Sequence, residues 1–143
     1  MKKTVLILLL AFTVCARTFA QQTAEDYFNS GNAHYENNNF NKAIADYTQA
    51  IKLNPHFAEA YYFRGNSYSL ADSDKAIADY TEAIRLNPRY AEAYYNRGWA
   101  YCWIEDYDKA IADFEAVLKI EPNNAKAKNG IEQAKKARGE VGK

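Results

Sequence analysis

The chain has 143 residues, and its 18 Lys and Arg residues balance 18 Asp and Glu residues to give a formal net charge of zero. This balance excludes the strongly basic surface that binding to a nucleic-acid backbone requires, so nucleic acid is not an expected partner. Only two histidines and two cysteines are present. No cluster of them has the spacing of metal ligands, which argues against a metal enzyme.

The first twenty residues have the layout of a secretory signal peptide. A short basic start precedes an apolar run over residues 5–14, and small side chains follow at Thr18 and Ala20. The apolar run is shorter than the roughly 20 residues that span a bilayer. We therefore expect cleavage after Ala20, export to the periplasm or the medium, and no stable membrane insertion afterwards. An uncleaved N-terminal anchor is the alternative.

Signal cleavage would leave Cys102 as the only cysteine, so no intrachain disulfide could form. The remaining chain would carry three more acidic than basic residues, because Lys2, Lys3 and Arg17 leave with the signal. A lone thiol in an oxidising compartment is either a small buried packing residue or available for pairing between chains. A homo-oligomer is therefore a possible form of the protein.

One block of sequence recurs along the rest of the chain with a period of 33 or 34 residues. Ala-Glu-Ala-Tyr-Tyr-x-Arg-Gly stands at residues 58–65 and again at 91–98. A period in this range is typical of stacked helical repeats rather than of a globular enzyme core. Equivalent positions are Gly31, Gly65 and Gly98, then Ala43, Ala76 and Ala110, and finally Pro55, Pro88 and Pro122.

Each unit is predicted to contain two helices joined by a tight turn. In the first unit, a helix begins after a Thr23 cap and ends at residues 37–39, because Asn competes for the backbone hydrogen bonds of a helix. A second helix ends before Pro55, whose ring disfavours helix in the preceding residue. The same pattern predicts helix pairs within residues 58–88 and 91–122.

A glycine in the middle of each first helix costs roughly 1 kcal/mol relative to alanine. Its recurrence at one repeat position indicates that two helices approach closely there. Large side chains are expected to interdigitate with these glycines and with the repeated alanines. We therefore expect Gly65→Leu or Ala76→Leu to overpack the seam. The large residues are Tyr47, Tyr80 and Phe114.

The pattern Tyr-x-x-x-Gly-x-x-Tyr, followed by Ala, Tyr or Phe, Ala and Pro, resembles the tetratricopeptide repeat. The resemblance implies an all-α, right-handed superhelical solenoid of antiparallel helix pairs, whose concave groove is lined by the first helix of each pair. The second repeat is one residue short between Tyr68 and Ala76, which is expected to shorten its inner turn and reorient the next helix. The implied organisation is a lead-in at 21–23, a domain at 24–138 with repeats at 24–57, 58–90 and 91–124 and a capping helix at 125–138, and a flexible tail at 139–143.

The capping segment carries a narrow apolar stripe of Ala127, Ile131 and Ala134 among many lysines. Such a helix resembles the one that covers the last apolar face of a repeat array. A membrane-surface helix is the alternative, and it is disfavoured because the stripe lacks Trp, Phe and Leu.

Charged residues also recur at fixed repeat positions. We expect Arg64 to pair with Asp46, and Arg97 with Asp79, across the junctions between repeats. Solvated charges that contribute almost nothing to stability are the alternative.

The face of the first helices that does not pack into the stack is rich in aromatic side chains, which dominate binding hot spots. By resemblance this face lines the concave groove, where Asn side chains could bind the backbone of a peptide. The alternative is that the aromatic residues complete the core of a short array. The predicted partner-binding residues are Phe28, Asn32, Tyr35, Tyr62, Asn66, Tyr95, Trp99, Cys102 and Trp103.

One subclass of the family is disfavoured. Members that clamp the C-terminal carboxylate of a chaperone use Lys and Arg in this groove, whereas this chain has other residues there. Asn32 and Asn66 fit the clamp pattern, and the departures are Phe28, Phe63, Glu92 and Asn96.

No residues form a catalytic constellation, a Gly-rich phosphate loop or a cofactor site. The sequence therefore predicts a protein that is not an enzyme and that has no cofactor. We expect an exported adaptor that binds a peptide segment or a partner protein in an aromatic groove. A self-associating structural protein, or an accessory subunit of an envelope assembly or secretion complex, is the alternative.

Overall fold

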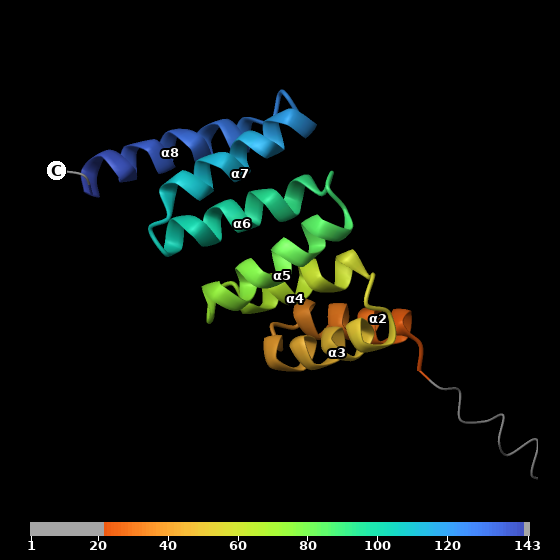
Figure 1. The fold of residues 1–143 in the computed structure, drawn as a ribbon. Coiled ribbons are helices and arrows are strands. Elements are labelled where there is room, and N and C mark those ends of the chain that lie inside the picture. Colours follow the sequence, from red (N-terminus) through yellow and green to blue (C-terminus); the bar gives the residue numbers. More distant parts are fainter. Residues whose placement is uncertain (1–21, 142–143) are drawn as a thin grey trace, which may run out of the picture.

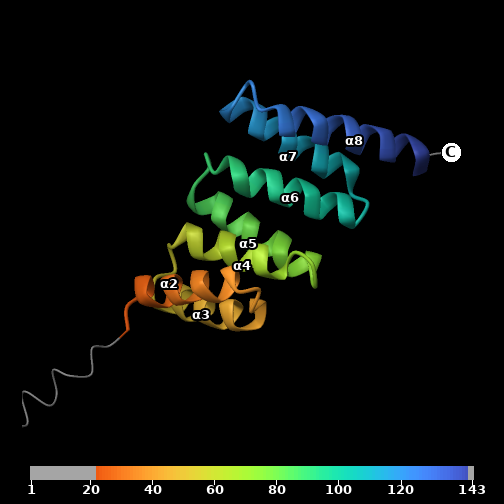
Figure 2. The same cartoon turned by 180° about the vertical axis from the view of Figure 1, so that it is seen from behind.

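The computed structural model describes residues 22–141, so the predicted signal peptide lies outside the described residues. Figures 1 and 2 show helices stacked in consecutive pairs, with the first and the last described helix at opposite ends of the stack. The described part is all-helical, and its helix pairs form a superhelix, as predicted. The seven helices of this part are α2 (Ala24–Glu36), α3 (Phe40–Leu53), α4 (Ala58–Tyr68), α5 (Ser73–Leu86), α6 (Ala91–Trp103), α7 (Tyr107–Ile120) and α8 (Ala125–Val141).

Polar side chains fix several helix starts. The Thr23 hydroxyl oxygen accepts a hydrogen bond from the Asp26 backbone N–H, and the Asp26 carboxylate accepts one from the Thr23 N–H, which completes a capping box. The hydrogen bond that the Asp26 carboxylate accepts from the Thr23 N–H, followed by the effect of the Thr23 side chain, lowers the pKa of Asp26. The carboxylates of Asp72 and Asp106 likewise cap α5 and α7, because each accepts from the backbone N–H three residues on.

The helix ends follow the predicted breakers. Extended backbone at Asn54 and Asn87 terminates α3 and α5, and a proline follows each of these residues. The turns after α2 and α6 contain Asn38 and Glu105 in the left-handed region, with φ of 58° and 61°. A left-handed residue costs non-glycine side chains some strain, and Asn tolerates it best.

The missing residue of the second repeat shortens a helix. Helix α4 has 11 residues, whereas its equivalents α2 and α6 have 13. Helix α5 keeps the 14 residues of α3 and α7. Helix α4 therefore ends two residues early, and Leu70 in the connection that follows is 88% exposed.

The glycine positions are the points of closest helix approach, as predicted. A Cβ atom at Gly31 would lie 2.6 Å from the Tyr47 ring, and one at Gly65 would lie 2.8 Å from the Tyr80 ring. Such distances leave no room for a side chain. Phe114 is enclosed from two sides, because Gly98 in α6 and Gly130 in α8 both approach its ring.

The arginine pairs differ from the prediction. Arg64 forms two hydrogen bonds with Asp79 of its own repeat, at 2.8 and 2.7 Å, rather than with Asp46 of the preceding one. A third hydrogen bond reaches Thr48 across the repeat junction. The reason is geometric: the aspartate on the second helix of the same pair lies directly opposite, and only the far guanidinium nitrogen reaches the preceding repeat.

The third repeat shows the same correction. Arg97 bonds Asp113 of its own repeat at 2.7 and 2.8 Å, rather than Asp79, and its third hydrogen bond goes to Thr81 of the preceding repeat. The first repeat has Ser30 at the arginine position, and the Ser30 hydroxyl donates to Asp46. Across the junction between repeats, the arginine therefore donates a hydrogen bond to a threonine and does not form an ion pair.

Helix α8 covers the last repeat. It packs along α7 (Figure 1), with Ala127 and Ala134 buried and Ile131 against the same cluster. The helix continues to Val141, beyond the predicted end of the cap at residue 138. Within residues 22–141, no helix is long and apolar enough to span a bilayer.

Candidate peptide-binding groove

A cavity of about 380 Å³ lies between the first helices of the pairs. Helices α4 and α6 supply most of its walls, α2 contributes Tyr35, and Tyr80 of α5 lies at its base. Of the nine predicted groove residues, the structure brings five together here. The lining residues are Tyr35, Tyr62, Asn66, Ser69, Leu70, Tyr80, Asn96, Trp99, Ala100 and Trp103.

Asn66 is the centre of the polar wall. Its Oδ1 accepts hydrogen bonds from the Tyr80 hydroxyl at 2.8 Å and from Asn96 Nδ2 at 2.9 Å. Burial raises the pKa of Tyr80 far above its usual value, so this hydroxyl stays protonated and donates. Because Oδ1 accepts two hydrogen bonds, the orientation of the Asn66 amide is fixed. The N–H groups on Nδ2 of Asn66 are then the donors available to a ligand.

The third repeat exchanges this polar pair for an apolar one. Trp99 stands at the repeat position of Asn66, and Phe114 stands at that of Tyr80. The two rings pack edge to face, with centroids 5.3 Å apart. A phenylalanine ring has no hydroxyl to donate, and the indole fills the space instead. The groove therefore has a hydrogen-bonding half and an apolar half.

Two predicted residues lie outside the cavity. Phe28 joins an aromatic cluster, with ring centroids 4.8 Å from Phe57 and 5.7 Å from Phe63. Asn32 accepts a hydrogen bond from the Tyr47 hydroxyl at 2.8 Å, as Asn66 does from its own tyrosine. At this end of the array the aromatic side chains of α2 and α4 therefore pack against one another.

The remaining two predicted residues line neighbouring cavities. Tyr95 faces a cavity of about 370 Å³ that also contains Tyr62 and Asn96. Cys102 lines a cavity of about 250 Å³ beside Trp103 and Ala134 of α8. Cys102 is half-buried, and burial raises the pKa of its thiol. The thiol is therefore a weaker nucleophile than an exposed cysteine.

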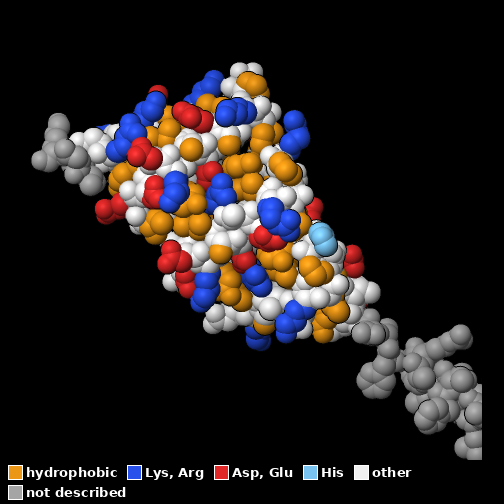
Figure 3. Space-filling view, in the orientation of Figure 1, with side chains coloured by type: hydrophobic (Ala, Val, Ile, Leu, Met, Phe, Trp, Pro, Cys, Tyr) orange, Lys and Arg blue, Asp and Glu red, His pale blue; other side chains and the backbone are white. Residues whose placement is uncertain are grey.

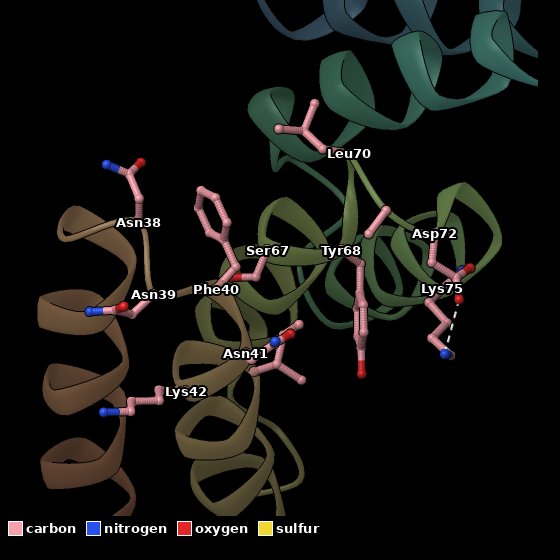
Figure 4. Close-up of a pocket in the computed structure, with 12 residues that line it drawn as sticks. Asn38, Asn39, Phe40, Asn41, Lys42, Ser67, Tyr68, Leu70, Asp72 and Lys75 are labelled. Carbon is pink, nitrogen blue, oxygen red and sulfur yellow. Dashed lines mark hydrogen bonds and ion pairs between the residues drawn. The ribbon is translucent and has the colours of Figure 1, made fainter.

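A larger cavity at one edge of the stack was not predicted. Its volume is about 640 Å³, and it lies between the α2–α3 turn and the α4–α5 connection. Figure 4 shows Asn38 and Asn39 on one side, the ion pair of Asp72 with Lys75 on the other, and Leu70 projecting away from that pair. Leu70 also lines the groove cavity. This exposed leucine of the shortened second repeat therefore lies between the two cavities.

The charges on the described surface favour neither metal nor nucleic acid. On the face in Figure 3, Lys and Arg side chains alternate with Asp and Glu, and hydrophobic patches lie between them. In residues 22–141, no group of three His, Cys, Asp or Glu side chains could hold a metal ion. The groove cavity between α4 and α6 is lined by uncharged side chains.

Sequence comparison decides the family. A profile of the tetratricopeptide repeat matches residues 91–124, and a TPR repeat profile matches residues 31–71 and 72–103. The chain belongs to the tetratricopeptide repeat (TPR) family. A search of curated protein sequences gave no match.

Solved structures agree with this assignment. The first TPR domain of Spaghetti (RPAP3) bound to the HSP90 peptide SRMEEVD is 30% identical, with a TM-score of 0.78, and the match covers 81% of this chain and 93% of that one. The Arabidopsis OM64 TPR domain is 35% identical, with a TM-score of 0.76 and coverage of 80% and 95%. MamA is 32% identical, with a TM-score of 0.79 and coverage of 81% and 68%. TPR domains are binding modules, typically without catalytic activity.

The TPR groove of this chain lacks the basic side chains of a carboxylate clamp. Phe28 and Phe63, at two of the clamp positions, pack against each other. Asn96 at a third position donates to Asn66 and to the Tyr62 hydroxyl. Glu92 at the fourth brings a negative charge to the mouth of the groove.

Proposed function

We propose that this TPR protein is an adaptor that binds a peptide segment of a partner protein in its concave groove. The observation that carries the proposal is the cavity between α4 and α6, where two tryptophans and an oriented asparagine amide face one hollow. Support comes from the similar Spaghetti domain, which holds an HSP90 peptide. Large aromatic side chains with a polar neighbour are typical of binding hot spots.

The two halves of the groove suggest how a peptide is held. The Nδ2 donors of Asn66 bind a backbone carbonyl of the ligand, because the Oδ1 acceptor is already engaged. Trp99 and Trp103 pack on an apolar side chain of the ligand, and Trp103 has 75% of its surface exposed to receive it. The ligand is an extended segment with at least one aromatic or aliphatic anchor.

Affinity capture from cell extract tests the proposal. The parent protein is compared with a Tyr62→Ala, Tyr95→Ala, Trp99→Ala variant whose folding is verified by circular dichroism. Leu53→Ala on α3 serves as the matched control, because Leu53 is an exposed apolar residue outside the groove cavities. A partner that the parent and the control retain and the groove variant loses supports the proposal. Equal retention by all three rejects it.

We also propose that the protein is exported. This proposal rests on the basic, apolar and small-residue order of residues 1–20. Cell fractionation and mass spectrometry of the N-terminus test it. A chain that starts at Gln21 in the periplasm or the medium supports export, and an intact N-terminus in the cytosolic fraction rejects it.

Self-association is a second candidate function, either as a structural protein or as an accessory subunit of an envelope assembly. The exposed apolar side chains of Leu70, Trp103 and Ile104 favour it, since Leu70 and Trp103 line one cavity and a contiguous exposed apolar patch is typical of an interaction surface. Light scattering with and without reductant separates the forms. A dimer lost on reduction indicates pairing through Cys102, and a dimer lost in Trp103→Ala indicates apolar association.

A further inference from the structure

The groove between α4 and α6 is apolar at one end. Leu70 and Trp103 line it where α4 and α6 finish, and they are 88% and 75% exposed. Trp99 lies one helical turn back from Trp103, in the same cavity. This end fits an aromatic or aliphatic anchor and offers no charge to a ligand.

A second cavity, at the start of α6, lies next to the opposite end of the groove. Tyr62 and Asn96 line both cavities and are joined by a hydrogen bond from Asn96 Nδ2 to the Tyr62 hydroxyl, so the two cavities share this wall, and together they are called the trough. Glu92 and Glu121 bring two carboxylates to this end, and Lys126 is the one cationic residue of its lining. The lining of this end is therefore net negative.

Tyr90 lies beside this end of the trough. Burial raises the pKa of Tyr90, and Tyr62, Glu59 and Glu92 raise it further. The Tyr90 ring lies 4.9 Å from the Tyr62 ring at the junction of the two cavities. Within the described residues, neither Glu59 nor Glu92 has an ion-pair partner.

Helix stability explains some of these acids and not others. Glu59 and Glu92 stand in first turns, where a carboxylate favours the helix dipole. Glu121 is the C-cap residue of α7, at the negative end of the dipole, where a carboxylate is unfavourable. Asn54 and Asn87 occupy the equivalent caps. The third repeat thus has an acid where the other repeats have a neutral amide. One oxygen of this acid accepts a hydrogen bond from Asn124 Nδ2, and Asn124 in turn accepts from the Ala127 N–H at the start of α8.

We propose that the partner segment combines an apolar anchor with a basic residue: the anchor packs on Trp99 and Trp103, and a Lys or Arg faces Glu92 and Glu121. This inference rests on the proposed groove function and specifies its ligand. Residues 92 and 103 are separated by about 16 Å along α6 at 1.5 Å per residue. An extended peptide covers that distance in about five residues at roughly 3.3 Å each. The charge preference is opposite to that of the acidic peptide held by the similar Spaghetti domain.

Fluorescence anisotropy with designed peptides tests the inference. The probe is fluorescein-labelled Lys-Lys-Ser-Gly-Ser-Gly-Trp-Leu with an amidated C-terminus, and its counterpart has Glu-Glu in place of Lys-Lys. Both are also made in reversed order, because the groove does not fix the direction of the chain. We expect the basic peptide to bind about tenfold more tightly at low salt, since each exposed ion pair changes an affinity by up to about fivefold. The preference should weaken as salt rises.

Charge-neutral variants complete the test. Glu92→Gln with Glu121→Gln should remove the preference and leave binding of the anchor, whereas Glu115→Gln with Glu132→Gln should keep it, because these exposed acids lie outside the trough. Equal binding of both peptides, or a preference that survives in the first variant, overturns the inference while the groove function stands. Binding of neither peptide also overturns it. The capture experiment with the groove variant then decides the groove function separately.

Discussion

Tyr80 belongs both to the core and to the groove. Its ring packs at the glycine of α4, and its hydroxyl donates to Asn66 in the polar wall. A change that displaces the ring therefore also releases the oriented amide. The same arrangement recurs in the first repeat with Tyr47 and Asn32, so the tyrosine that sets the helix spacing also orients an asparagine of the first helix.

Gly65→Leu should destabilise the protein by about 1–3 kcal/mol through overpacking. The physical reason is the 2.8 Å distance between a Cβ at Gly65 and the ring of Tyr80, which is almost fully buried and cannot move aside. Urea unfolding measures the effect. Gly139→Leu is the matched control, because nothing lies within 4 Å of that position in α8. The control should be unchanged or slightly more stable, since Gly disfavours helix. Equal stability of the Gly65 variant and the parent would show that the contact between α4 and α5 can accommodate a side chain at this position.

Cys102 should react slowly with iodoacetamide at pH 8. Burial raises the pKa of its thiol, so less thiolate is present in the folded protein than in the unfolded chain. The pKa of this thiol is higher in the folded state than in the unfolded state. Its contribution to the free energy of unfolding is therefore fully present below the unfolded-state pKa, and it is lost as pH rises through the folded-state pKa. Mass spectrometry of the Cys102 peptide, with and without urea, gives both rates. A faster reaction in the folded protein would contradict the prediction.

At the scale of helices, the Arg97–Asp113 pair should couple α6 to α7 by about 1–3 kcal/mol in a double-mutant cycle. Both side chains are largely buried and joined by two hydrogen bonds. Burial lowers the pKa of Arg97, but Asp113, together with Tyr101 and Tyr94, raises it by more, so the arginine stays charged. The exposed Arg85–Glu82 pair is the internal comparison. Its coupling should be only about 0.3–0.5 kcal/mol. Equal couplings would mean that burial adds nothing to the pair.

The ends of helices were predictable from the sequence where a single type of residue determines them. Asn37–Asn39 ended α2, and prolines followed α3 and α5, because their effects on the backbone are local. The partner of Arg64 was not predictable in the same way. Repeat spacing identifies equivalent positions, but it does not say whether the aspartate of the same or the preceding repeat lies opposite.

For the groove too, repeat spacing identifies equivalent positions but does not say which side chains share a cavity. Period and composition predicted the aromatic face, and five of its nine residues share one cavity. Phe28 lies outside this cavity, and its ring packs against the rings of Phe57 and Phe63. The cavity at the α4–α5 connection arises from a deletion of one residue. The deletion was visible in the sequence, but the loss of two helical residues from α4, rather than a change in α5, required the structure.

At the scale of the whole molecule, each repeat contacts mainly its neighbours, so stability depends on how the ends of the stack are closed. Deleting residues 125–143 should lower the unfolding free energy by about 3 kcal/mol or more. The deletion would expose Phe114 and Val117, and each buried side chain of this kind contributes roughly 1.5–3 kcal/mol. Urea unfolding and light scattering measure the loss and the expected association through the uncovered α7 face. Lys128→Ala, which changes only the exposed side of α8, should do neither. A stable, monomeric deletion variant would mean that α7 needs no cover, and α8 would then be a candidate for the binding surface instead.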